Sequence, residues 1–135
     1  MLRLPYSIYL DMVGHALDEL PNEACGLFGG DPKTGRVEVF YRCRNTAESS
    51  RVYEVDPRCH LQADRDAESR GLELIGVMHS HTHTEAYPSP TDVAQAIDPA
   101  WHYAIVSLRD EAPVLHSYRI SDGIIAEEVV AAEGR

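Results

Sequence analysis

The first pattern of apolar and polar positions along the chain is helical and covers residues 7–20, SIYLDMVGHALDEL. Ser7 can cap the first turn, and Pro21 with Asn22 ends the pattern. We therefore expect an amphipathic helix near the start of the chain. Its apolar residues recur at every fourth position and share one face of that helix: Ile8, Met12, Ala16 and Leu20.

Short apolar runs of strand length occupy much of the remaining chain, and turn-forming residues separate them. The sequence GDPKTG is typical of a tight turn between two strands. The run LELIGVMHS is almost continuously apolar, as expected of a central strand that is covered on both faces. We expect strands over residues 24–30, 36–42, 51–55, 72–80, 101–108, 113–120 and 123–130.

Two further helices are indicated by the residues that begin them. Asp56 and Pro57 supply a cap and a first-turn proline for a helix that runs to about Arg70. Ser89 and Pro90 supply the same two signals for another helix. The chain is therefore expected to combine a mixed sheet with about three helices, an α+β class of fold.

The size of the chain fits a single domain over residues 1–135, and 44% hydrophobic residues can fill its core. We expect the ordered part to span about residues 5–130, with the last five residues frayed. The sequence contains no tandem repeat and no low-complexity tract. It leaves the oligomeric state open.

Charge and composition limit the partners. The formal net charge is −10 and no basic cluster offsets it, so nucleic acid is not an expected partner. No apolar run approaches the roughly 20 residues that span a bilayer, and the N-terminus lacks the apolar core of a signal peptide. Three cysteines without a CxxC motif argue against a disulfide framework. We therefore expect a cytoplasmic protein.

The segment MHSHTHTEAYPSPTD concentrates side chains that bind metals. His79 and His81 end a predicted strand and lie two positions apart, so they share a face about 6.6 Å apart along the backbone. Asp92 follows in the first turn of the next helix, which can return over the strand end. Two imidazoles and one carboxylate leave a fourth tetrahedral position open, which is typical of catalytic zinc sites.

The same residues also have a purely structural interpretation. Ser89 and Asp92 nearly form a capping box, and His-x-His can be exposed polar residues at a strand end. The two roles of Asp92 are compatible, because one oxygen can accept a backbone hydrogen bond while the other binds an ion. We expect His83 to be an exposed loop residue rather than a further ligand. Spacing alone leaves both interpretations open.

The order His79-x-His81, seven residues, Ser89-x-x-Asp92 resembles the signature of the JAMM (MPN+) metalloproteases. Three further segments match the family: PNEACGLFGG, NTAESSRVYEVDP and HYAIVSL. The resemblance covers about residues 8–130 and implies a curved mixed sheet in a three-layer arrangement like that of cytidine deaminases. It also implies that the two histidines and Asp92 bind Zn²⁺.

The resemblance further assigns two catalytic residues. It implies that Glu23 is the general base and that Ser89 stabilises the reacting oxygen. Spacing would not have selected Glu23, because other glutamates are equally ionisable: Glu19, Glu38, Glu54 and Glu85.

The strings HSHTHTEAYPSPTD, NEACG and SYRISDG are similar to a subgroup of this family that acts on a small ubiquitin-like sulfur-carrier protein. This similarity implies hydrolysis of the amide bond after the carrier's C-terminal Gly-Gly, with release of cysteine. A diglycine tail can enter a narrow groove and pair as an added strand. We expect residues 45–53 and the region of Tyr87 to form that groove.

Several alternatives remain open. The substrate could be another ubiquitin-like modifier or carrier, and the chain could be a non-catalytic binding scaffold of the same fold. Two histidines and a carboxylate also form the facial triad of non-haem iron oxygenases. Cys25 could be considered as a nucleophile, but it lies in an apolar strand, where cysteine is usually inert.

Overall fold

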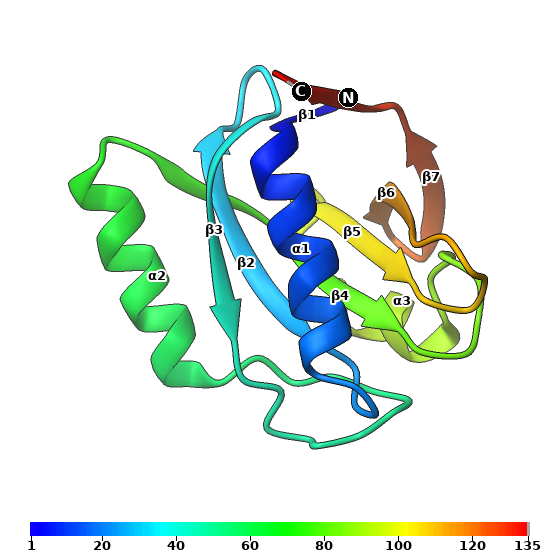
Figure 1. Ribbon diagram of the computed structural model, residues 1–135. Helices are drawn as coiled ribbons and strands as arrows, with labels where there is room; N and C mark the ends of the chain where they lie inside the picture. The colour runs from blue at the N-terminus through cyan, green and yellow to red at the C-terminus, as the bar shows by residue number, and fades with distance from the viewer. Residues whose placement is uncertain (135) are drawn as a thin grey trace.

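The computed structural model describes residues 1–134 and contains one eight-stranded mixed sheet with three helices (Figure 1). The strands lie in the order β7-β6-β5-β4-β2-β3-β1-β8. The expected α+β class is confirmed. The elements are β1 (Leu2–Pro5), α1 (Tyr6–Asp18), β2 (Cys25–Asp31), β3 (Arg36–Cys43), α2 (Pro57–Ser69), β4 (Glu73–His81), α3 (Pro90–Gln95), β5 (His102–Ser107), β6 (Val114–Ser121), β7 (Ile124–Glu128) and β8 (Val130–Glu133).

The sheet is covered on both faces, which confirms the three-layer arrangement. Helix α1 lies in front of the sheet in Figure 1, and its Met12 packs in one core with Phe28 and Met78. The neighbouring strand residues Leu27 and Val77 belong to a second core, which includes side chains of α2 and α3. Consecutive strand residues point to opposite faces, so the central strands contribute to both cores.

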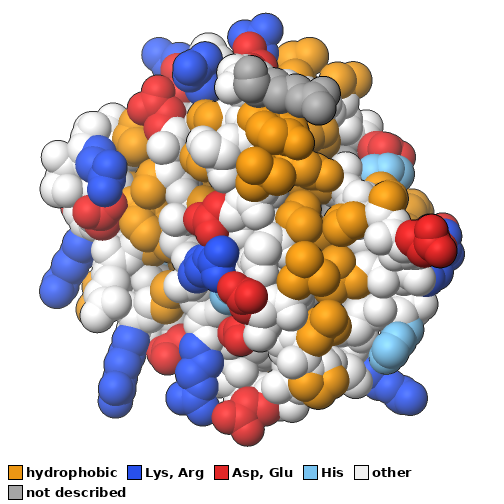
Figure 2. Space-filling model, in the orientation of Figure 1, with side chains coloured by type: hydrophobic (Ala, Val, Ile, Leu, Met, Phe, Trp, Pro, Cys, Tyr) orange, Lys and Arg blue, Asp and Glu red, His pale blue; other side chains and the backbone are white. Residues whose placement is uncertain are grey.

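The outer surface of α1 is amphipathic. Figure 2 shows hydrophobic side chains in a band across this face of the molecule, next to charged side chains. Leu10 and Leu17 of α1 are half exposed. Arg42 of β3 ties the helix to the sheet, because its guanidinium contacts both Asp11 and Asp18 at 2.6–2.8 Å. These exposed pairs orient the helix but add little stability.

The two ends of the chain differ from the sequence prediction. Strands β1 and β8 pair in parallel, with Leu2 opposite Val130 and Pro5 opposite Glu133. The chain ends lie close together at the edge of the sheet (Figure 1). The prediction that the last five residues are frayed is therefore wrong for residues 131–133, and residue 135 lies outside the described residues. Four-residue segments carry too little periodicity to reveal a pairing between opposite ends of a chain.

Two local predictions are also wrong. Residues 51–55 do not form a strand, and Val55 makes only an isolated bridge to Asn45. Helix α1 has Pro5 at its N-cap without a side-chain cap, so Ser7 lies inside the first turn. The helices that begin after Asp56 and Ser89 start as predicted, and in both the capping side chain accepts a backbone hydrogen bond.

A disulfide joins Cys43 at the end of β3 to Cys59 in the first turn of α2, with a Cα–Cα distance of 5.7 Å. The cysteine count argued against a disulfide framework, but one pair of the three cysteines forms a disulfide. The bond closes a loop over residues 44–58. It removes one argument for a cytoplasmic location, which stays a prediction. Within residues 1–134, no helix has the length and apolar character needed to cross a membrane.

Strand β4 lies at the centre of the sheet, between β2 and β5. Its Gly76 allows the close packing of this region, because a Cβ there would lie 2.3 Å from both the Phe28 ring and the His102 carbonyl oxygen. Three residues later, His79 lies between Cys25 of β2 and Ile105 of β5. The C-terminal end of β4 is therefore held on both sides by backbone pairing.

Candidate metal centre and catalytic cleft

Three side chains converge at the C-terminal end of β4. The Nε2 atoms of His79 and His81 are 3.1 Å apart, and they lie 3.1 and 3.0 Å from Oδ2 of Asp92. All three residues are buried. Ligand atoms around a tetrahedral zinc ion are about 3.3 Å apart, given bond lengths of about 2.0–2.1 Å. The spacing of these donor atoms therefore fits a divalent metal.

The position of Asp92 follows from local sequence. Ser89 caps α3 through its hydroxyl, which accepts from the Asp92 N–H at 3.1 Å, and the Ser89 N–H donates to Asp92 Oδ2 at 2.9 Å. The predicted capping box is therefore present. The two roles do not divide between the two carboxylate oxygens, because Oδ2 contacts both the Ser89 N–H and the histidines. Its orientation is thus set before any ion binds.

A backbone contact sets the tautomer of His81. Its Nδ1 lies 2.8 Å from the carbonyl oxygen of Glu85. A carbonyl oxygen only accepts, so Nδ1 carries the proton and Nε2 of the neutral ring presents a lone pair. This lone pair faces His79 and Asp92. Such a support for a histidine ligand is common in metal sites.

His79 is supported by an aromatic ring. Tyr53 stacks on its imidazole, with centroids 4.3 Å apart and an interplanar angle of 19°. Nδ1 of His79 has no hydrogen-bond partner among the described residues. Burial lowers the pKa of His79, so its ring stays neutral and can bind a metal.

The ionised carboxylate of Asp92 favours a cation at the cluster. Burial would raise the pKa of Asp92, but the contacts with both histidines hold it well below its ordinary range, so the carboxylate is ionised. Burial would lower the pKa of His81, but its contacts with Asp92 and the Glu85 carbonyl outweigh burial and raise it. Two imidazole nitrogens and an anionic oxygen are ligands that zinc prefers. The residues present therefore fit the metal that the sequence resemblance implies.

Glu23 faces the same cleft from the loop before β2. It is 4% exposed, and its Oε1 has no hydrogen-bond partner within residues 1–134. Removal from water raises its pKa to about 8, partly opposed by the charge of His81. The negative charge of Asp92 raises the pKa of Glu23 further. A carboxyl group with a pKa near neutrality can both accept and donate a proton.

Sequence reasoning missed the residues that hold this glutamate in place. The Glu23 N–H donates to Ser49 O at 2.8 Å, and its carbonyl accepts from Asn45 Nδ2 at 3.0 Å. The next residue, Ala24, donates its N–H to Ser80 Oγ at 2.7 Å. Ser80 lies between the two histidines and faces away from them, as its position on the strand predicts. Only the tertiary structure reveals what these polar side chains contact.

A cleft of about 510 Å³ contains Glu23, His81 and Ser89. Two of its other walls are residues 50–51, which lie in the predicted groove segment, and residues 82–84. His83 is exposed at the rim and lies outside the group of three convergent residues, so it is a loop residue as expected.

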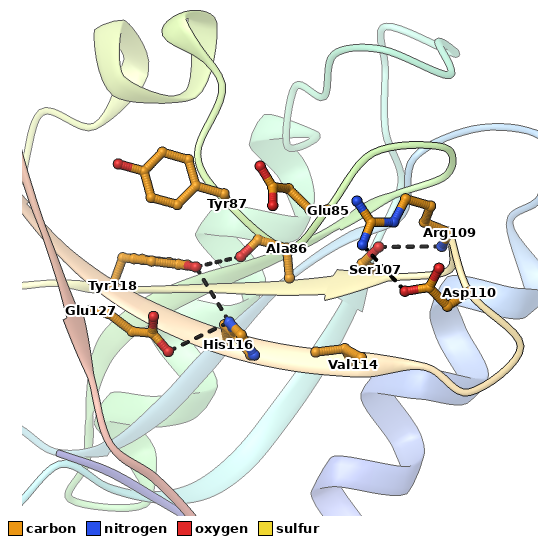
Figure 3. Close-up of a pocket in the computed structure, with 10 residues that line it drawn as sticks. All are labelled: Glu85, Ala86, Tyr87, Ser107, Arg109, Asp110, Val114, His116, Tyr118 and Glu127. Carbon is orange, nitrogen blue, oxygen red and sulfur yellow. Dashed lines mark hydrogen bonds and ion pairs between the residues drawn. The ribbon is translucent and has the colours of Figure 1, made fainter.

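Tyr87 is not part of this cleft. It is half exposed and lines a separate cavity of about 260 Å³, which shares no lining residue with the cleft (Figure 3). There its ring packs edge-on against Tyr118, whose hydroxyl donates to the carbonyl of Ala86. The cavity also contains the contact of His116 Nδ1 with the Glu127 carboxylate, at 3.5 Å. Tyr87 therefore packs against β6 and does not line the predicted groove.

Cys25 is fully buried, and burial raises the pKa of its thiol to about 12. The thiol stays protonated at neutral pH and is therefore a poor nucleophile. This supports the interpretation of Cys25 as a packing residue.

Comparison with known proteins shows the family of the chain. A sequence profile described as prokaryotic homologues of the JAB domain matches residues 5–121. The chain therefore belongs to this family, and its resemblance to the JAMM (MPN+) proteins is confirmed.

Individual relatives are similar over most of the chain. It is 42% identical over 120 residues to a CysO-cysteine peptidase from Mycobacterium tuberculosis, covering 88% of this chain and 82% of that one. It is 34% identical over 93 residues to a desampylase from Haloferax volcanii, covering 68% and 67%. A solved structure from Desulfitobacterium hafniense has a TM-score of 0.91 at 36% identity, covering 100% of this chain and 94% of that one.

Proposed function

We propose that this protein is a cytoplasmic zinc-dependent peptidase of cysteine biosynthesis. Its proposed substrate is a small ubiquitin-like sulfur-carrier protein that carries cysteine after its C-terminal Gly-Gly. The reaction hydrolyses the amide bond after Gly-Gly and releases cysteine. The observation that carries the proposal is the convergence of His79, His81 and Asp92, with donor atoms 3.0–3.1 Å apart, in a cleft that also contains Glu23.

The three convergent residues would hold the metal. A zinc ion there would polarise the scissile carbonyl and make water a stronger nucleophile at neutral pH. Glu23 accepts a proton from the attacking water and later donates it to the leaving amine of cysteine. Without a metal, burial raises the pKa of Glu23 to about 8, and a divalent cation in the same cleft would lower it. The bonds from Ser49 and Asn45 keep its backbone fixed while the proton moves.

Ser89 has a hydroxyl proton available for the reaction. Its oxygen accepts from the Asp92 N–H, so the cap uses the lone pair and leaves the O–H free to donate. The hydroxyl lies in the cleft and can donate to the oxyanion that develops on the scissile carbonyl. The Ser89 hydroxyl can therefore cap α3 and donate to the oxyanion at the same time.

The substrate class is supported by the relatives. The mycobacterial relative, 42% identical, is named a CysO-cysteine peptidase. The name of the haloarchaeal desampylase supports the alternative, cleavage of a different ubiquitin-like conjugate. A scaffold without activity is disfavoured because all the metal and acid–base positions are filled. The two enzymatic alternatives differ in the substrate that binds in the cleft and in the amide bond that is hydrolysed.

The proposal is tested with a purified carrier protein extended by one cysteine after Gly-Gly. Wild type with zinc should release cysteine, and Glu23→Gln should lower kcat about 10²–10⁴-fold while zinc binding remains. Glu54→Gln is the matched control, because Glu54 is an exposed glutamate of the neighbouring loop. Undiminished turnover in Glu23→Gln would remove the assigned base.

Metal content tests the centre itself. Wild type should bind one zinc per chain, and His81→Ala should bind far less because one ligand is lost. Elemental analysis of protein expressed with both zinc and iron available would distinguish the two metals. Iron with oxygen uptake would contradict the proposal.

A further inference from the structure

We propose that Arg51 recognises the α-carboxylate of the cysteine that leaves, and so makes the cleft specific for a carrier extended by one free amino acid. This inference rests on the proposed function. Arg51 lines the same cleft as Glu23 and His81. It is exposed at the rim, where a substrate can reach it.

The backbone next to Arg51 is tied to both parts of the active site. Ser49 O accepts from the Glu23 N–H at 2.8 Å, and Ser50 O accepts from the hydroxyl of Thr82 at 3.2 Å. The Arg51 N–H itself donates to Ser49 Oγ at 3.0 Å. Arg51 is therefore held next to residues that contact the base on one side and the neighbour of His81 on the other.

The guanidinium of Arg51 is available for a ligand. Within residues 1–134 its side chain makes no ion pair and no hydrogen bond. The nearby Arg44 differs, because its Nη2 pairs with Glu48 at 3.0 Å. Among the residues that line the cleft, Arg51 is the one arginine or lysine.

The reaction supplies a matching anion. Cysteine joined through its amine to the carrier keeps a free α-carboxylate, two bonds from the scissile nitrogen. The same cleft already contains the carboxyl group of Glu23. The α-carboxylate of the substrate would be a second acidic group there, and a cation beside it would favour its binding. Arginine binds a carboxylate through two parallel hydrogen bonds. A lysine side chain conjugated through its ε-amine would place no carboxylate at this position, so Arg51 separates the two classes of substrate.

The test compares two forms of one substrate, a ubiquitin-like sulfur carrier ending in Gly-Gly-Cys as the free acid or as the C-terminal amide. Wild type should prefer the acid about 10- to 100-fold in kcat/KM, as expected for a charge-assisted hydrogen bond. Arg51→Ala should reduce that preference to within about threefold of unity, mainly through KM, and Arg51→Lys should restore part of it. Arg58→Ala, on α2 outside the cleft, should keep the full preference.

Each other outcome overturns the inference. Equal cleavage of acid and amide by wild type would show that the carboxylate is not recognised. An equal loss on both substrates in Arg51→Ala, with the preference kept, would assign Arg51 a structural role. Wild type that cleaves neither form while binding zinc would contradict the proposed function, and the inference with it. Circular dichroism and zinc content check that each variant is folded.

Discussion

The ring of Tyr53 stacks on the imidazole of His79, with the two centroids 4.3 Å apart. Tyr53 lies in the irregular segment between β3 and α2, and His79 lies in the central strand β4. The flat contact leaves the ring of His79 little freedom to rotate. In many metal sites the second ring nitrogen of a histidine ligand is held by a hydrogen bond. Nδ1 of His79 has no such partner within residues 1–134, and the stacking compensates for this.

Loss of this stacking should weaken metal binding. Tyr53→Ala is expected to lower zinc affinity about 10-fold, the lower limit for removing a group that supports a metal ligand. Tyr53→Phe keeps the ring and should bind zinc within about twofold of wild type. Competition with a chromophoric chelator measures both affinities. Equal affinity of Tyr53→Ala and wild type would show that the stacking does not orient His79.

The Cys43–Cys59 disulfide should stabilise both the fold and the cleft. It closes a loop that contains Asn45, Ser49 and Tyr53, three residues that contact Glu23 or His79. Reduction should therefore lower the free energy of unfolding by about 3 kcal/mol, given the loop length. Urea denaturation with and without reductant measures the loss.

The double variant Cys43→Ser/Cys59→Ser provides the control for this experiment. It should match the reduced wild type and should not respond to reductant. If reductant also destabilised the variant, the loss of stability would come from a group other than this disulfide. Turnover should fall in parallel with stability, because the loop carries the contacts that position Glu23.

The raised pKa of Glu23 makes the stability of the metal-free protein depend on pH. Its pKa rises from 4.5 in the unfolded chain to about 8 in the folded one, so the folded state holds the proton more tightly. Proton binding by Glu23 therefore stabilises the folded state, and this stabilisation is fully present below pH 4.5. It is lost as the pH rises to 8, which lowers the free energy of unfolding by at most about 5 kcal/mol. Glu23→Gln does not titrate and should lose less stability over the same interval. Denaturation of chelator-treated protein from pH 5 to pH 9 measures the difference, and parallel curves would contradict it.

Gly76 should tolerate no side chain. A Cβ there would lie 2.3 Å from the Phe28 ring and from a backbone oxygen of β5, and backbone cannot move as a side chain can. Gly76→Ala is expected to cost about 1–3 kcal/mol or more through overpacking. Gly14→Ala is the control, because its Cβ meets only the end of the Arg42 side chain at 3.3 Å and alanine favours the helix. Thermal unfolding compares the two variants, and equal melting temperatures would refute the argument.

Much of the fold could be predicted because its signals are local. The period of apolar residues located α1 and most strands, and proline after a capping residue located the starts of α2 and α3. The failures involve segments whose structure depends on distant partners. Residues 51–55 resemble a strand, but no neighbouring strand pairs with them beyond a single bridge. Residues 130–133 form a strand only because β1 lies beside them.

The sequence by itself determined the relation of His79 to His81 and of Ser89 to Asp92. Covalent geometry sets both, because strand residues two apart share a face and a capped first turn orients its own side chains. Tertiary structure alone decided which side chains surround them: Ser80 and Asn45 behind Glu23, Tyr53 on His79, Arg51 at the rim, and the Cys43–Cys59 bond. These contacts join strands and loops far apart in the chain. These contacts depend on the register of the strands and on the packing of the whole sheet, which no short segment encodes.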